Sequence, residues 1–135
     1  MKKKNINIPI HVCKVEAGFP SPADNYIEEK LDIQKYLIKN SESTFLVKAT
    51  GESMLNSGIL PGDILVVDRS LEANDQSIVI VSIDGDLTVK RLIKDNNLKI
   101  IYLRSENPDY PDIQLNEHKD VMLWGVVTYS IHHLT

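Results

Sequence analysis

A succession of short apolar segments, rich in β-branched residues and separated by turn signals roughly 8–12 residues apart, constrains the fold of this chain most strongly. The segments are Thr44–Ala49, Ile64–Val67, Ser77–Ile83, Leu87–Ile93, Leu98–Leu103 and Val121–Ile131. Asp84-Gly85, between two of them, is a typical two-residue hairpin turn. We therefore predict a mainly β fold of strongly bent sheets or a partial barrel, with one or two short helices.

The first 25 residues differ from the rest of the chain. They show little periodicity, and their three prolines disfavour helix. We predict that residues 1–25 form an extended arm and that residues 26–135 form one domain, because 135 residues are enough for a single core. Asp32 is placed to N-cap a short helix over Ile33–Lys39.

Composition excludes several classes of function. The net charge of −4 argues against sequence-specific DNA binding by the chain itself, which needs clustered basic residues. No apolar run approaches the roughly 20 residues of a membrane span, and the residues after Lys4 interrupt any signal-peptide core. The single Cys13 cannot form an internal disulfide, so the cytoplasm is the expected compartment.

Ser53 is the candidate nucleophile. It lies in the run Gly51-Glu52-Ser53-Met54, where the glycine gives a substrate backbone room to approach. Ser53 also has a structural interpretation, in which it N-caps one helical turn that ends at Gly58. The two interpretations are compatible, because free N–H groups at a helix N-terminus can serve as an oxyanion hole.

Histidine is the usual base for a serine nucleophile, but none of the four histidines has the context of a triad. The pair His132-His133 is more typical of exposure or packing. Adjacent strand residues point to opposite faces, which makes this pair a poor metal site. We expect neither a metal nor another cofactor.

Lys90 is the alternative base. A lysine accepts a proton only when it is neutral, and burial lowers its pKa from the ordinary value of about 10.4. Lys90 shares its predicted strand face with Thr88 and Leu92, so the face has some apolar character. The other interpretation is an outward-facing lysine on an amphipathic strand.

Ala17-Gly18 is a candidate cleavage site for this pair. Small residues suit a narrow cleft, and Val15 and Pro20 favour the extended form that proteases bind. The other interpretation is a plain linker.

Together these residues resemble the UmuD branch of the LexA-like self-cleaving serine peptidases. The matching segments, in colinear order, are Ala17–Ala23, Val47–Met54, Gly62–Asp68, Asp84-Gly85, Thr88–Leu92 and Gly125–Val127. The resemblance covers about residues 15–131 and keeps the spacing of the cleavage site, the serine and the lysine. It implies the mostly β fold of LexA and signal peptidase.

The resemblance also implies the roles of individual residues. Ser53 would be the nucleophile, and Lys90 the general base that later protonates the leaving amine. The backbone N–H groups of Glu52 and Ser53 would form the oxyanion hole, and the chain would cut itself between Ala17 and Gly18.

The resemblance implies partners as well. It implies a homodimer whose cleavage is stimulated by RecA filaments on single-stranded DNA after DNA damage. The product from Gly18 onward would be an accessory subunit of a UmuC-like Y-family polymerase in SOS mutagenesis and translesion synthesis. Two alternatives stay open: a stand-alone LexA or phage-repressor-type peptidase domain without a polymerase role, and a signal-peptidase-like enzyme, which needs a membrane anchor.

Overall fold

The computed structural model describes residues 6–12, 27–115 and 120–135. The chain divides into two compact units, Met1–Lys39 and Asn40–Thr135. This division groups residues 27–39 with the N-terminal unit, whereas the sequence predicts the boundary after residue 25. The assignment of residues 1–25 as an arm remains a prediction.

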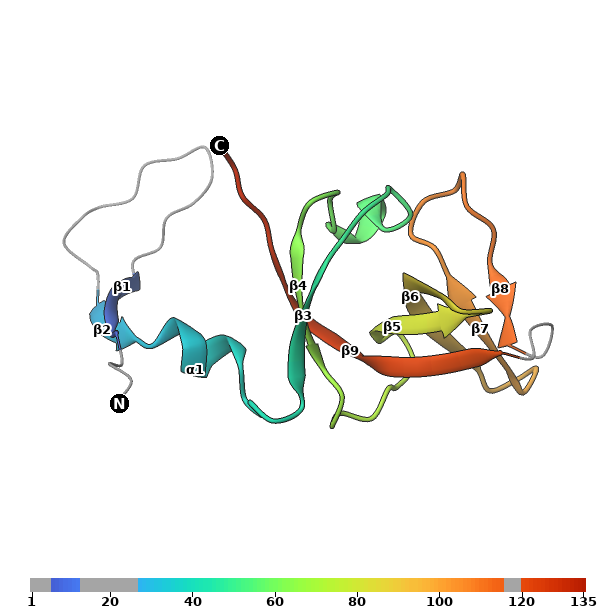
Figure 1. Ribbon diagram of the computed structural model, residues 1–135, viewed down its shortest axis with the longest axis horizontal. Helices are drawn as coiled ribbons and strands as arrows, with labels where there is room; N and C mark the ends of the chain where they lie inside the picture. The colour runs from blue at the N-terminus through green and yellow to red at the C-terminus, as the bar shows by residue number, and fades with distance from the viewer. Residues whose placement is uncertain (1–5, 13–26, 116–119) are drawn as a thin grey trace. The chain divides into compact units, whose positions relative to one another are not determined.

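The N-terminal unit contains two paired strands and a helix. β1 (Ile8–Val12) pairs antiparallel with β2 (Ile27–Leu31), as Figure 1 shows. α1 (Ile33–Leu37) follows, and the Asp32 carboxylate accepts a hydrogen bond from the Lys35 N–H at 3.2 Å. The predicted cap is therefore confirmed, although the helix ends at Leu37 and not at Lys39.

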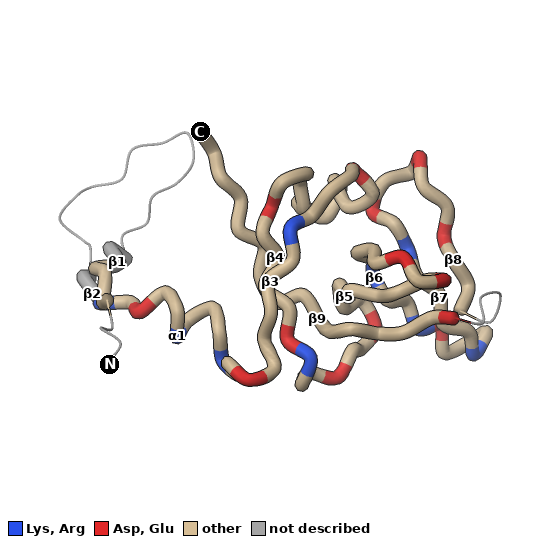
Figure 2. Tube along the Cα trace, in the orientation of Figure 1, with Lys and Arg blue, Asp and Glu red and all other residues tan. Residues whose placement is uncertain are grey.

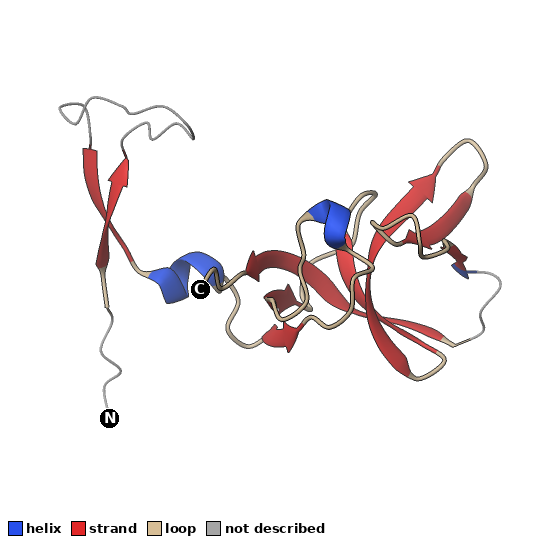
Figure 3. Ribbon diagram, turned by 90° about the horizontal axis from the view of Figure 1, so that it is seen from above, coloured by secondary structure: helices blue, strands red, loops and turns tan. Residues whose placement is uncertain are grey.

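The C-terminal unit is built around a seven-stranded antiparallel sheet with the order β3-β4-β9-β5-β6-β7-β8. Its strands are β3 (Thr44–Lys48), β4 (Ile64–Asp68), β5 (Ile78–Ile83), β6 (Asp86–Asp95), β7 (Ile100–Arg104), β8 (Ile113–Gln114) and β9 (Val121–Ile131). Figure 3 shows strands as the main regular elements of this unit. The mainly β fold is confirmed, and within the described residues the sheet is open and not a closed barrel.

β9 joins the two halves of the sheet. Its first part pairs with β5 and its last part with β4, and the register shifts once in each pairing. Such bulges bend a strand. A Cβ atom at Gly125 would lie 2.8 Å from Cγ1 of Val67 and 3.1 Å from the carbonyl oxygen of Asp68. Glycine is favoured where β9 changes partner, because any side chain there would force Val67 and the β4 backbone to shift.

Two buried apolar clusters form the core, one on each face of the bent sheet. The first consists of Ala49, Met54, Ile59, Leu65, Val67 and Ile80. The second consists of Ala73, Val79, Val81, Leu92 and Leu103. Val89 packs against the first cluster while Leu92 belongs to the second, so β6 is covered on both faces.

Charged residues of both signs are distributed along the described part of the C-terminal unit. Figure 2 shows acidic and basic positions interspersed over the C-terminal unit. Among the residues that the structure describes, no helix is both long and apolar enough to cross a bilayer.

Candidate active site

Ser53 lies in an irregular turn between β3 and a short 3-10 helix, η2 (Leu55–Ser57). The turn begins with Gly51 at φ +81°, and Gly58 at φ +83° is the C-cap of η2. One helical turn that ends at a glycine is thus confirmed. The residue at its N-cap is Met54, which makes no side-chain capping bond, so the interpretation of Ser53 as a helix cap is wrong.

Ser53 lines a cavity of about 270 Å³. The cavity lies between the end of β3 with its following turn and the start of β6. Its apolar wall includes Val47, Ala49, Met54, Ile59, Ile80, Leu87 and Val89. Ser53 and Thr88 are among its polar residues. A pocket with this lining suits small apolar side chains next to a serine hydroxyl.

One edge of β6 is open beside this cavity. β5 pairs with β6 along residues 86–91, but β7 pairs with it only from Arg91 onward. Within the described part of the chain, residues 86–90 therefore have no strand partner on their second edge. An extended peptide could form main-chain hydrogen bonds with this edge, as in β-strand addition.

Lys90 is buried, with only 6% of its surface exposed. Its Nζ donates to Oγ of Ser105 at 2.5 Å and lies 6.0 Å from the centre of the Tyr110 ring. Burial lowers the pKa of Lys90, and the negative charge of Asp112 opposes this shift only in part. The interpretation of Lys90 as an outward-facing surface lysine is therefore wrong.

The structure brings Ser53 and the strand of Lys90 to one cavity, since Ser53, Thr88 and Val89 all line it. Within the described residues, no hydrogen bond joins the Ser53 hydroxyl to Nζ of Lys90, whose hydrogen-bond partner is Ser105. The Ser–Lys dyad thus stays a prediction. In structures without substrate, catalytic hydrogen bonds are often long and tighten only when substrate binds.

The predicted oxyanion hole also stays a prediction, although its groups are available. Within the residues that the structure describes, neither the Glu52 N–H nor the Ser53 N–H donates a hydrogen bond. The predicted cleavage residues Ala17 and Gly18 lie outside the described residues.

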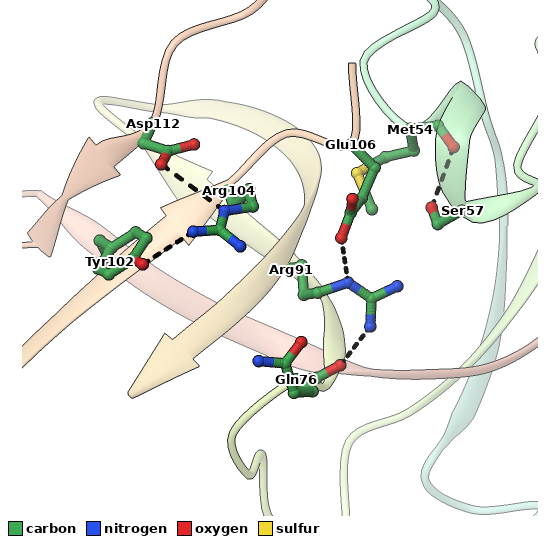
Figure 4. Close-up of polar contacts among 8 residues, drawn as sticks. All are labelled: Met54, Ser57, Gln76, Arg91, Tyr102, Arg104, Glu106 and Asp112. Carbon is green, nitrogen blue, oxygen red and sulfur yellow. Dashed lines mark hydrogen bonds and ion pairs between the residues drawn. The ribbon is translucent and has the colours of Figure 1, made fainter. Parts of the chain in front are cut away.

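Sequence reasoning missed the segment that follows β7. Ser105 accepts the hydrogen bond from Lys90, and the Glu106 side chain forms an ion pair with Arg91, which Figure 4 shows. Asn107 donates from Nδ2 to the Glu52 carbonyl at 2.8 Å. The only signal in the sequence was a run of three polar residues after an apolar strand, which does not say what they contact.

Asp63 is buried and makes a second set of polar contacts. Its carboxylate accepts hydrogen bonds from the Leu60 N–H and the Ser130 hydroxyl, each at 2.9 Å, and lies 2.5 Å from Nδ1 of His132. The Leu60 N–H, followed by His132 and Ser130, holds the pKa of Asp63 below its usual value despite burial. The Asp63 carboxylate lies between the Ser130 hydroxyl and the His132 ring. In a catalytic triad the histidine lies between the serine and the carboxylate, so this cluster is not a triad.

Comparison with known proteins gives consistent similarities. Residues 9–128 match the Peptidase S24-like family. Protein ImpA of Salmonella typhimurium is 40% identical over 124 residues, which cover 92% of this chain and 83% of ImpA. Protein MucA of Escherichia coli is 36% identical over 126 residues, which cover 93% of this chain and 84% of MucA. A LexA repressor of Clostridium perfringens is 38% identical over 112 residues, which cover 83% of this chain and 54% of the repressor.

Proposed function

The chain belongs to the Peptidase S24-like family, and on that basis we propose that it is a serine peptidase that cuts its own N-terminal arm between Ala17 and Gly18. One observation carries this proposal. Lys90, a strongly basic residue type, is buried on the strand whose preceding residues line the Ser53 cavity. Burial favours the neutral amine, which is the form that can accept a proton from a serine hydroxyl.

The first half of the reaction is an acyl transfer. Neutral Lys90 takes the Ser53 hydroxyl proton as Oγ attacks the carbonyl carbon of Ala17. The N–H groups of Glu52 and Ser53 stabilise the negative oxygen that forms. The bond from the Ala17 carbonyl to the Gly18 nitrogen then breaks, and Lys90 returns its proton to the leaving amine.

The second half of the reaction restores the enzyme. A water molecule attacks the ester between Ala17 and Ser53, again with Lys90 as the base. The products are a carboxylate at Ala17 and a free Ser53 hydroxyl. In both halves Nζ of Lys90 must turn from Ser105 toward Ser53, and Ser105 offers it a hydrogen-bond partner before and after cleavage.

We propose that the arm binds as an extended strand along the open edge of β6. This edge ends at Lys90, and residues 87–89 form one wall of the cavity. A small residue such as Ala17 fits a pocket with an apolar lining, and Gly18 leaves its backbone accessible to the nucleophile.

The same family resemblance supports the proposed biology. In this proposal the protein is a cytoplasmic homodimer, and RecA filaments on single-stranded DNA stimulate its cleavage. The product from Gly18 onward acts as an accessory subunit of a UmuC-like Y-family polymerase in SOS mutagenesis and translesion synthesis. The similarity to ImpA and MucA, which extends over more than four-fifths of each, supports this choice.

Alkaline incubation of the purified protein, followed by mass spectrometry, tests the proposal. We expect a fragment that begins at Gly18. Ser53→Ala and Lys90→Ala should abolish it, and Gly18→Glu should block it by bulk. Lys94→Ala, a lysine change on the same strand, is the matched control and should still be cut. Intact wild-type protein after prolonged incubation at high pH with RecA filaments would contradict the proposal.

A further inference from the structure

The side-chain amide of Asn107 makes a hydrogen bond at each end. Its Oδ1 accepts from the Asp109 N–H at 3.1 Å, and its Nδ2 donates to the Glu52 carbonyl at 2.8 Å. The Asn107 carbonyl also accepts from the Tyr110 N–H at 3.0 Å. Because Asp109 occupies the amide oxygen, the amide nitrogen is held facing the turn that contains the nucleophile.

This contact fixes a peptide plane. Glu52 lies outside any strand or helix, so no ladder of backbone bonds sets the direction of its carbonyl. The bonds that hold this carbonyl come from Asn107 and, at 3.3 Å, from the Leu55 N–H. In a planar trans peptide the carbonyl and the following N–H point in opposite directions. Holding the Glu52 carbonyl toward Asn107 therefore turns the Ser53 N–H away from Asn107.

We propose that Asn107 is a positioning residue for the oxyanion hole, because it sets the direction of the Ser53 N–H. The inference rests on the proposed function, in which that N–H stabilises the negative oxygen. The availability of the group supports it, because the Ser53 N–H has no acceptor within the described chain. Ser53 itself lines the cavity where that oxygen would form.

Neighbouring contacts hold Asn107 in place relative to the base. Ser105 accepts from Nζ of Lys90, and Glu106 forms its ion pair with Arg91, the next residue of β6. The Glu106 carbonyl accepts from the Asn56 N–H at 2.8 Å, on the far side of the serine turn. The segment that begins at Ser105 therefore ties the base strand to the nucleophile turn, and Asn107 is its contact with the oxyanion hole.

Asn107→Asp removes the donor and keeps the shape of the side chain. The carboxylate can still accept from the Asp109 N–H, but it cannot donate to the Glu52 carbonyl. Removing an oxyanion-hole donor costs about 100- to 1,000-fold in rate, and misdirecting one should cost about 10- to 100-fold. We expect this loss in the rate of alkaline self-cleavage. Asn96→Asp makes the same chemical change in the exposed turn after β6 and should leave the rate unchanged.

Two further readouts separate positioning from a structural role. Asn107→Ala adds no charge, so Lys90 should be unaffected. Cleavage should then slow by the same factor at every pH, and the midpoint of the pH–rate curve should not change. Reaction of Ser53 with a small phosphonyl fluoride should slow in proportion, because the phosphonyl oxygen uses the same donors. The melting temperature should stay within a few degrees of wild type.

Wild-type rates of cleavage and phosphonylation in both Asn107 variants would overturn the inference, as would a loss of rate in Asn107→Ala that a shifted midpoint explains. The proposed function fails separately if the wild type never yields the Gly18 fragment. Slow phosphonylation of Ser53 in both variants would support the positioning role even then.

Discussion

At the residue scale, the burial of Lys90 that the proposed mechanism requires opposes stability. Its side chain is buried against Ser105, and burial lowers its pKa in the folded protein. Between that lowered pKa and the ordinary value of 10.5, the unfolded chain binds more protons than the folded one. The free energy of unfolding should therefore rise with pH across this window.

Lys90→Met tests this effect on stability. Methionine fills a similar volume without a charge, so the variant should be more stable than wild type near neutral pH, by about 1 kcal/mol or more. The advantage should shrink as the pH approaches 10.5. Urea unfolding near neutral pH and near pH 10 measures both values. The account would be contradicted if the stability advantage of Lys90→Met over wild type were smaller near neutral pH than near pH 10.

At the scale of elements, β9 determines how strongly the sheet bends. It pairs with β5 and β4 in turn, and its Gly125 lies against Val67 and Asp68 where the partners change. The bend places the turn after β3 and the start of β6 at one cavity. The geometry of the site thus depends on a strand that contributes no predicted catalytic residue.

Gly125→Ala tests the role of this crossing. The added methyl group would overlap a β4 side chain and approach β4 backbone, so we expect a loss of about 1–3 kcal/mol in the free energy of unfolding. Urea denaturation measures it. Stability equal to that of wild type would mean that the two strands can separate at the crossing at little cost.

The elements that could be predicted from sequence are those with a strong local pattern. The bounds of β9 agree at both ends with the prediction, and the Asp84-Gly85 hairpin is present, with φ values of +50° and +90°. β8, with two residues, is too short to show a period. β1 pairs with β2 although residues 13–26 separate the two strands in the sequence, and such a pairing leaves no local pattern.

The same limit applies to the site. The burial of Lys90 was left open by the sequence, because a lysine on a strand face with some apolar character can also point outward. The position of Asn107 could not be predicted, because its bond to Glu52 joins positions 55 residues apart and depends on where β7 ends in the folded sheet. Ser105 was missed for the same reason, since only the pairing of β6 with β7 brings it to Lys90.

At the scale of the whole molecule, Asp63 ties several parts of the C-terminal unit together. Its carboxylate bonds to Leu60, Ser130 and His132, and its carbonyl accepts from the Ala49 N–H at 2.7 Å, before the serine turn. Because these contacts lower the pKa of the folded carboxyl, its stabilisation is present above about pH 3.9 and is lost as the pH falls through the lowered pKa.

Asp63→Asn should therefore lower the free energy of unfolding at neutral pH and lose less of it on acidification than wild type does. Urea unfolding at a series of pH values from about 3 to 7 compares the two. Asp86→Asn, at an exposed carboxylate, is the matched control and should follow wild type. Parallel pH dependence of wild type and Asp63→Asn would contradict this role.

The pH dependence of self-cleavage tests the central claim most directly. The quantity to measure is the initial rate at which the fragment beginning at Gly18 appears, from about pH 7 to 11. We predict that the rate rises with pH and then levels off, as one buried lysine loses its proton. The midpoint of this rise should lie below pH 10.5. No fragment should form in Ser53→Ala or Lys90→Ala. A wild-type protein that stays intact, or a rate that still rises about tenfold per pH unit above 10.5, would contradict a neutral lysine as the base.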